Sequence, residues 1–123
     1  MSQAFIIISI TPEPWRVRHL RAVSRAHLTE WGLAALTDTM EVLVSEIAGN
    51  AVRHTRSDRI TLSLSVADGV VRLEVDDNTH GHPQLRHPGP EEERGRGLLI
   101  VDALATDWDT SEDGSATWCT LAA

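Results

Sequence analysis

The stretch from residue 60 to residue 75 reads ITLSLSVADGVVRLEV and contains the clearest structural signal in the chain. Apolar and polar residues alternate on both sides of Asp68-Gly69, a dipeptide that favours the two-residue type I′ turn of a β-hairpin. The pairs that follow from this turn, all on one side of the sheet, are Val66 with Val71, Leu64 with Leu73, and Leu62 with Val75. Because a register that matches both faces rarely arises by chance, the sequence predicts an antiparallel hairpin with one apolar face.

Residues 4–10, upstream of the hairpin, are apolar and mostly β-branched. This composition predicts a strand that is either buried on both faces or paired early. The segment Thr11-Pro12-Glu13-Pro14 ends that strand and favours the start of a helix, because proline is tolerated in the first helical turn. A rough apolar stripe beginning at Trp15 continues this helix to Trp31, and Gly32 suits its end.

A second helix is predicted from Thr37 or Asp38 to His54. Either of the two polar residues can cap its N-terminus, and Glu41 follows Asp38 at the spacing of a capping box. Its apolar residues fall at helical steps and form one stripe, which consists of Met40, Leu43, Val44, Ile47 and Ala51. We expect this stripe to face the core.

The regular pattern stops in residues 77–94, which hold three prolines, three histidines and a run of three glutamates. A loop of this length in a small domain is usually functional or mobile. The histidines, His80, His82 and His87, lack a fixed metal-ligand spacing, so incidental loop histidines explain them better than a metal site. Gly95-Arg96-Gly97 then leads into a short third helix that includes Leu104.

Residues 106–110 and 116–122 predict a closing hairpin, with Glu112-Asp113-Gly114 as its turn. The order of elements is therefore β-α-α-β-β-loop-α-β-β. Helices grouped beside a mostly antiparallel sheet indicate an α/β two-layer sandwich with the helices on one face. The length of 123 residues suits a single domain, which we expect to span residues 1–123.

The charge, the cysteine content and the length of the apolar runs argue against several classes of protein. The chain has 11 Lys+Arg, all of them arginine, against 18 Asp+Glu, and its formal charge is −7. This acidic balance argues against a reader of DNA or RNA and against an anionic membrane surface. The lone Cys119 cannot form an internal disulfide and is expected to be a core thiol, and no apolar run is long enough to span a bilayer. We therefore expect a cytoplasmic protein.

Three polar residues of the second helix share one side of it. At 100° per residue, Glu46, Asn50 and Arg53 fall within roughly 60° of one another, along the edge of the apolar stripe. The amide oxygen of Asn50 is a suitable ligand for Mg²⁺, which prefers hard oxygen donors. An ordinary solvated polar face is the alternative interpretation, and spacing alone favours it slightly.

Two further signals are suited to a nucleotide. Asp77 follows the second strand of the hairpin, where its carboxylate can accept a hydrogen bond from an exocyclic amine such as that of adenine; the alternative is a turn-forming Asp. Gly95-x-Gly97 precedes a helix, so its backbone N–H groups can hold phosphate oxygens, with Arg94 and Arg96 adding positive charge. An ordinary helix entry is the alternative here, and a P-loop is excluded because the chain has no lysine.

The order of these signals closely resembles that of the GHKL ATPase superfamily. Residues 46–54, EIAGNAVRH, are similar to its N box, a helix that carries a Glu four residues before a Mg²⁺-binding Asn. Asp77-x-Thr79-x-Gly81 resembles the D-x-G-x-G box, with Thr79 in place of the first glycine. Gly95-Arg96-Gly97-Leu98 resembles the G-x-G-L box, and residues 114–121 resemble the final box and strand.

The chain is also similar to the bacterial anti-sigma-factor serine kinases, especially the small actinobacterial type. The similarity lies in its compact length and in the sequence stretches EWGL, NAVRHT and GRGLLIVDALA. The resemblance covers nearly the whole chain. It implies the Bergerat type of sandwich, the fold of histidine-kinase-like ATPases, with ATP and Mg²⁺ as ligands.

The resemblance also implies a role for each matching residue. Asn50 ligates Mg²⁺, Glu46 acts as general base toward a serine hydroxyl or water, and Asp77 accepts a hydrogen bond from the adenine amine. The other ATP-binding residues that it implies are Arg53 and His54 near the phosphates, Gly81 beside the adenine, Gly95, Arg96, Gly97 and Leu98 at the phosphate end, and Thr117 behind the adenine.

The activity that the resemblance implies is that of a serine/threonine kinase. Such a kinase phosphorylates an anti-anti-sigma (antagonist) protein and so regulates a sigma factor. The resemblance also leads us to expect a homodimer formed through the first strand and helix. The alternative hypothesis is a catalytically silent ATP-binding switch module that sequesters a partner protein. The catalytic half of a histidine kinase is disfavoured, because the chain lacks room for a phosphoacceptor helix pair.

Overall fold

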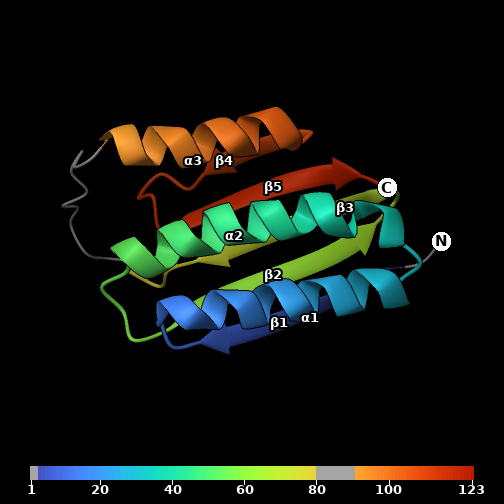
Figure 1. The fold of residues 1–123 in the computed structure, drawn as a ribbon, viewed down its shortest axis with the longest axis horizontal. Helices are drawn as coiled ribbons and strands as arrows, with labels where there is room; N and C mark the ends of the chain where they lie inside the picture. The colour runs from blue at the N-terminus through green and yellow to red at the C-terminus, as the bar shows by residue number, and fades with distance from the viewer. Residues whose placement is uncertain (1–2, 80–90) are drawn as a thin grey trace.

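The computed structural model describes residues 3–79 and 91–123, with the backbone alone for residues 91–97. Within them, five strands form one antiparallel sheet in the order β1-β2-β3-β5-β4, and three α-helices lie over one face of it (Figure 1). The elements are β1 (Ala4–Ile10), the 3₁₀ turn η1 (Pro14–Arg16), α1 (Val17–Glu30), the 3₁₀ turn η2 (Ala34–Leu36), α2 (Thr37–His54), β2 (Ile60–Ala67), β3 (Val70–Asp76), α3 (Glu91–Leu104), β4 (Asp107–Thr110) and β5 (Ala116–Ala122). The predicted α/β two-layer sandwich is confirmed.

The central hairpin has the predicted register. The pairs are Val66 with Val71, Leu64 with Leu73, and Leu62 with Val75. Asp68 and Gly69 have φ angles of 51° and 76°, and a type I′ turn requires positive values at both positions. The closing hairpin of β4 and β5 is confirmed as well, with Gly114 in its turn at a φ of 76°.

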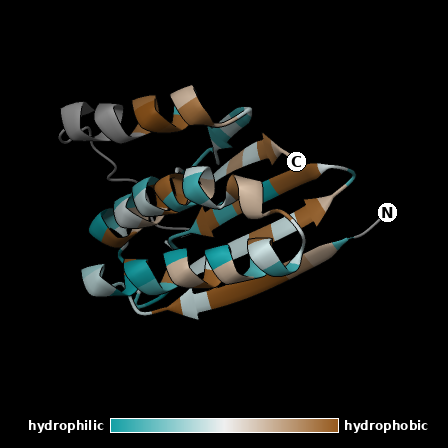
Figure 2. Cartoon of the chain, turned by 45° about the vertical axis from the view of Figure 1, so that its right-hand side comes forward, coloured by the Kyte–Doolittle hydropathy of each residue, from teal (hydrophilic) through white to brown (hydrophobic). Residues whose placement is uncertain are grey.

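β1 is one of the two edge strands of the sheet and is hydrophobic over most of its length (Figure 2). It pairs with β2, so that Ile6 lies beside Leu64 and Ile8 beside Leu62. Burial on both faces was a wrong expectation, because the side chains of Phe5 and Ile7 are 71% and 62% exposed. The helices cover only one face of the sheet, and alternate residues of β1 therefore point to the uncovered face.

The core lies between the helices and the sheet. Its fully buried side chains include Leu20 and Leu28 of α1, Met40, Leu43 and Val44 of α2, Ile60, Leu62 and Leu64 of β2, Val71, Leu73 and Val75 of β3, and Val101 of α3. The apolar stripe of α2 therefore faces the core as expected. The first helix begins as a 3₁₀ turn and its α-helical part starts at Val17, which leaves Trp15 about half exposed.

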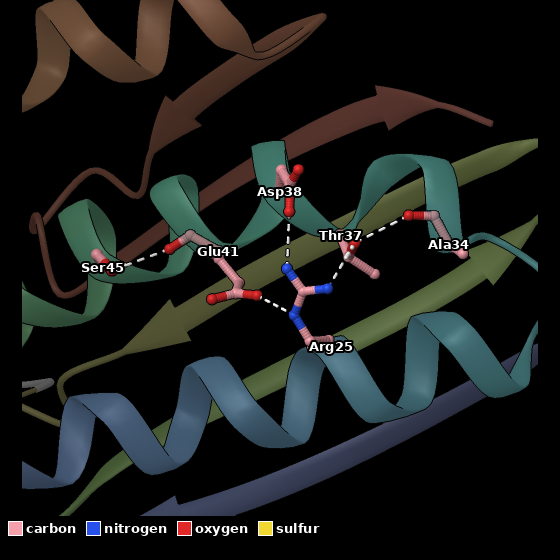
Figure 3. A network of polar contacts seen from close by, with 6 residues as sticks. All are labelled: Arg25, Ala34, Thr37, Asp38, Glu41 and Ser45. Carbon is pink, nitrogen blue, oxygen red and sulfur yellow. Dashed lines mark hydrogen bonds and ion pairs between the residues drawn. The ribbon is translucent and has the colours of Figure 1, made fainter.

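The predicted side-chain cap of α2 is wrong. The N-cap position is Leu36, which has no capping side chain, and the hydroxyl of Thr37 donates backward to the carbonyl of Ala34 at 2.8 Å. The reason is that the 3₁₀ turn η2 leads directly into α2, so the backbone is already helical before Thr37. The carboxylates of Asp38 and Glu41 instead accept hydrogen bonds from the guanidinium of Arg25 on α1 (Figure 3).

α3 begins earlier than predicted, at Glu91 rather than after Gly97. Residues 91–94 are therefore helical and do not belong to a loop. The physical reason lies in the acidic run, because glutamate has a high helix propensity and carboxylates are favoured near a helix N-terminus.

Candidate functional site

The C-terminal end of α2 meets the C-terminal end of β3. The hydroxyl of Thr55, the first residue after α2, donates a hydrogen bond of 2.5 Å to the main-chain oxygen of Asp77, the first residue after β3. Next to it, the side-chain amide of Asn78 donates to the carbonyl of Arg59 at 2.9 Å. These bonds fix the segment that follows β3 against the connection between α2 and β2.

Asp77 is almost fully buried at this junction, with 3% of its surface exposed. Its N–H donates to the carbonyl of Ser115 at 2.7 Å, which extends the pairing of β3 with β5 by one residue. Its carboxylate oxygen Oδ1 accepts two hydrogen bonds from Thr79, from the N–H at 3.0 Å and from the hydroxyl at 2.5 Å. Within residues 3–79 and 91–123 no hydrogen bond reaches Oδ2, so this oxygen is the acceptor left for a ligand.

Thr117 lies on the neighbouring strand and on the same side of the sheet as Asp77. It pairs with Val75, two residues before Asp77, and directly paired residues of antiparallel strands share a face. Both belong to the face that the helices cover, because Val75 and Cys119 are buried there. The structure therefore brings the half-buried Thr117 near the predicted adenine acceptor.

Glu46 and Asn50 lie one helical turn apart in the C-terminal half of α2. Both side chains are half-buried, at the edge of the stripe that includes the buried Ile47 and Ala51. In the described part of the chain neither of them makes a hydrogen bond or an ion pair. Polar side chains held at the border of a core without internal partners are free to bind an external polar ligand.

Arg53 and His54 are exposed at the end of α2. A Cβ placed on Gly49 would lie 3.7 Å from Nη1 of Arg53, so the guanidinium folds back along the helix over this glycine. The positive charge of Arg53 consequently lies on the turn that contains Gly49, next to Asn50. This position suits an anionic ligand held by the same turn.

The predicted phosphate-binding glycines have a different local structure from the one expected. Gly95 and Gly97 lie inside α3, with Arg96 between them, and their N–H groups therefore take part in helical hydrogen bonding. The expectation of a glycine loop that leads into the helix is wrong for this conformation. Leu98 is half-buried in α3, and Gly81 lies outside the described residues.

The described residues contain neither a metal-binding cluster nor a reactive thiol. No group of three or more His, Cys, Asp or Glu side chains that could hold a metal ion occurs among the described residues, and the three histidines of the sequence region 80–90 fall outside them. Cys119 is buried, as predicted, and burial raises the pKa of its thiol to about 12 against a smaller lowering by Arg72. It is therefore a core residue and not a nucleophile.

Sequence reasoning missed Thr55 and missed the hydrogen bonds of Thr79. The sequence signal for Thr79 is that it replaces the glycine of the D-x-G-x-G box. Thr55 has no such signal, because nothing in the sequence distinguishes it from any residue that ends a helix.

No helix of the described residues has the length and hydrophobicity needed to cross a membrane.

A family model described as the histidine kinase-like ATPase domain matches residues 10–122. No curated protein matches the chain significantly. The matched range includes α2, Asp77 and Thr117, and therefore the whole of the junction described above.

Proposed function

Since the chain belongs to the histidine kinase-like ATPase family, we propose that it binds ATP with Mg²⁺ at the junction of α2 and β3. The observation that carries this proposal is the buried carboxylate of Asp77, whose Oδ1 accepts from Thr79 and whose Oδ2 has no hydrogen-bond partner among residues 3–79 and 91–123. A buried carboxylate is costly unless its oxygens are hydrogen-bonded. The amino group of adenine is a donor that satisfies Oδ2.

The side chains of α2 fit a metal-bound triphosphate. Asn50 would hold Mg²⁺ through its amide oxygen, and the ion would neutralise charge on the phosphates when it is bound. Arg53 lies over Gly49 on the adjacent turn and adds a second positive charge there. The described residues provide no carboxylate cluster for the ion, so water and phosphate oxygens would supply its other ligands.

We further propose that the activity is that of a serine/threonine protein kinase. Glu46 accepts the proton of the serine hydroxyl, the hydroxyl oxygen forms a bond to the γ-phosphorus, and the bond from that phosphorus to the β,γ-bridging oxygen breaks, which releases ADP. Glu46 suits this role because it lies one turn from Asn50 and has no internal partner in the described structure. The protein substrate that we propose is an anti-anti-sigma protein, and the regulated partner is a sigma factor.

A catalytically silent ATP-binding switch is the second candidate. The observation that favours it is the helical conformation of Gly95 and Gly97, whose N–H groups are used within α3. A protein that binds ATP without these groups would retain the adenine contact and lose part of the stabilisation of the transferring phosphate. It would then act by holding a partner according to nucleotide state.

An experiment with Glu46 separates the two candidates. Purified protein, labelled ATP and candidate antagonist proteins are incubated, and acid-stable phosphoserine is measured for wild type and for Glu46→Gln, with the exposed Glu112→Gln as control. The kinase proposal predicts that only Glu46→Gln loses transfer while calorimetry shows unchanged ATP binding. Transfer that persists in Glu46→Gln overturns the base assignment, and ATP binding without transfer in wild type supports the switch.

A homodimer is also proposed, through β1. This strand pairs on one side only, and its exposed Phe5 and Ile7 lie on the uncovered face of the sheet. Exposed apolar edge strands readily pair with another chain. Sedimentation equilibrium tests this proposal, which predicts a dimer in wild type and a monomer in Ile7→Lys, whereas a monomeric wild type contradicts it.

A further inference from the structure

Thr79 holds the Asp77 carboxylate through a single oxygen. Its N–H and its hydroxyl both donate to Oδ1, at 3.0 Å and 2.5 Å, and Asp77 and Thr79 are 3% and 8% exposed. A glycine at position 79 would supply the N–H alone. The hydroxyl bond therefore depends on the residue by which this chain departs from the D-x-G-x-G pattern.

We propose that Thr79 is a positioning residue that makes the site selective for a purine with a 6-amino group. This inference rests on the proposed binding of ATP. An ionised carboxylate only accepts hydrogen bonds, and the two donors of Thr79 determine which oxygen faces the protein. Oδ2 is thereby directed to the ligand, while Thr55 fixes the main chain of Asp77 from the other side.

Selectivity follows from the direction of the hydrogen bonds. A 6-amino group donates to Oδ2, whereas a purine without this group leaves a buried charged acceptor unpaired. Sites built around such a polar contact strongly reject ligands that cannot make it. If the hydroxyl of Thr79 is removed, the carboxylate has one fewer restraint and can rotate away from the ligand. The energy of the amine contact then falls, whereas contacts with the ribose and phosphates are unaffected.

The same geometry predicts the behaviour of Asp77→Asn. The two donors of Thr79 require an acceptor, so the carboxamide of the variant places its oxygen toward Thr79 and its NH₂ toward the ligand. An NH₂ group donates to a 6-oxo purine and repels a 6-amino group. Asp77→Asn is consequently expected to reverse the preference, provided that Thr79 is intact.

The test compares nucleotide affinities by calorimetry. Wild type, Thr79→Val, Thr79→Ser and Thr120→Val are titrated with ATP and with purine riboside triphosphate, which lacks only the 6-amino group. Thr120 is the matched control because it lies on β5 opposite the exposed Arg72, on the other face of the sheet from Asp77. Wild type is expected to prefer ATP by roughly tenfold or more, as a hydrogen bond to a charged group warrants.

Thr79→Val is expected to lose most of this preference, whereas Thr79→Ser and Thr120→Val keep it. Asp77→Asn is titrated with inosine triphosphate, for which it should gain a preference that is smaller in the double variant Asp77→Asn/Thr79→Val, where only the N–H of residue 79 still orients the carboxamide. An unchanged preference for ATP in Thr79→Val overturns the positioning role while the proposed function stands. Failure of wild type to bind ATP at all overturns the proposed function and this inference with it.

Discussion

The hydroxyl of Thr55 donates a 2.5 Å hydrogen bond to the main-chain oxygen of Asp77, across a separation of 22 residues in the sequence. The same hydroxyl accepts a hydrogen bond from the N–H of Ser57 at 3.0 Å. Thr55 therefore links the end of the helix that carries Glu46 and Asn50 to the residue that we propose binds adenine. This link fixes the two halves of the site relative to one another.

Replacing Thr55 by valine should weaken both folding and nucleotide binding. The variant loses the bond to Asp77, and one net intramolecular hydrogen bond contributes about 1 kcal/mol to the free energy of unfolding. Urea unfolding measures the first effect and calorimetric titration with ATP the second. Thr55→Ser keeps the hydroxyl and serves as the control. Equal stability and affinity in Thr55→Val and wild type would contradict the linking role.

Local patterns in the sequence predict the sheet better than they predict the site. The register of β2 and β3 follows from alternation and from Asp68-Gly69, because both are local signals. The exposure of Phe5 and Ile7 is not local, since it depends on which face of the sheet the helices cover. The sequence prediction starts the third helix too late, after Gly97. It treats Gly95 and Gly97 as a helix boundary, although the glutamates at 91–93 have a high helix propensity.

The same distinction applies to the site. Asp77, Glu46 and Asn50 could be selected from residue type and spacing, because each follows a strand or shares a helix face. The contact of Thr55 with Asp77 joins residues far apart in the sequence and has no local signature. Hydrogen bonds of this kind become visible only when the elements are packed together.

Replacing Ser24 by alanine should stabilise the protein. Ser24 of α1 is fully buried, and among the described residues its hydroxyl oxygen has no hydrogen-bond partner. An unsatisfied buried hydroxyl costs on the order of 1 kcal/mol, and alanine also has the higher helix propensity. Urea unfolding should show a higher midpoint for Ser24→Ala. Ser45→Ala is the control and should not stabilise, because Ser45 donates to the carbonyl of Glu41. A lower midpoint for Ser24→Ala would refute this expectation.

Arg25 joins α1 to the start of α2, through Asp38 at 2.7 Å and through Glu41. The hydrogen bond with Glu41, and to a lesser extent the one with Asp38, raises the pKa of Arg25. The guanidinium is therefore charged at any pH at which unfolding is measured. Because of these two ion pairs, Arg25→Ala should unfold at a lower urea concentration than Arg18→Ala, which changes another exposed arginine of the same helix. The difference should shrink in high salt because exposed charges are screened. Identical midpoints for the two variants would show that the three side chains do not stabilise the helix pair.

The raised pKa of Cys119 predicts that the stability of the protein depends on pH. The thiol ordinarily ionises near 9.0, and burial raises its pKa to about 12 in the folded protein. Between these pH values the unfolded chain releases a proton that the folded chain retains, so the free energy of unfolding falls as pH rises. Below the lower value the contribution is fully present.

Cys119→Ala removes this contribution. Urea unfolding of wild type and variant at about pH 8 and about pH 11 should show the wild type losing more stability than the variant over this interval. Native Cys119 should also resist thiol reagents near neutral pH, since the thiolate is the reactive form. Parallel losses of stability in the two proteins would mean that the thiol ionises equally in both states.

The most direct test of the nucleotide site is calorimetric titration with ATP, with and without Mg²⁺, on wild type and Asn50→Ala. Thr39→Ala, at the other end of the same helix, is the control. We predict that wild type binds more tightly with Mg²⁺, that Asn50→Ala loses roughly tenfold or more of that affinity, and that Thr39→Ala loses none. Absence of ATP binding by wild type, or equal Mg²⁺-dependent affinity in Asn50→Ala, would contradict the site.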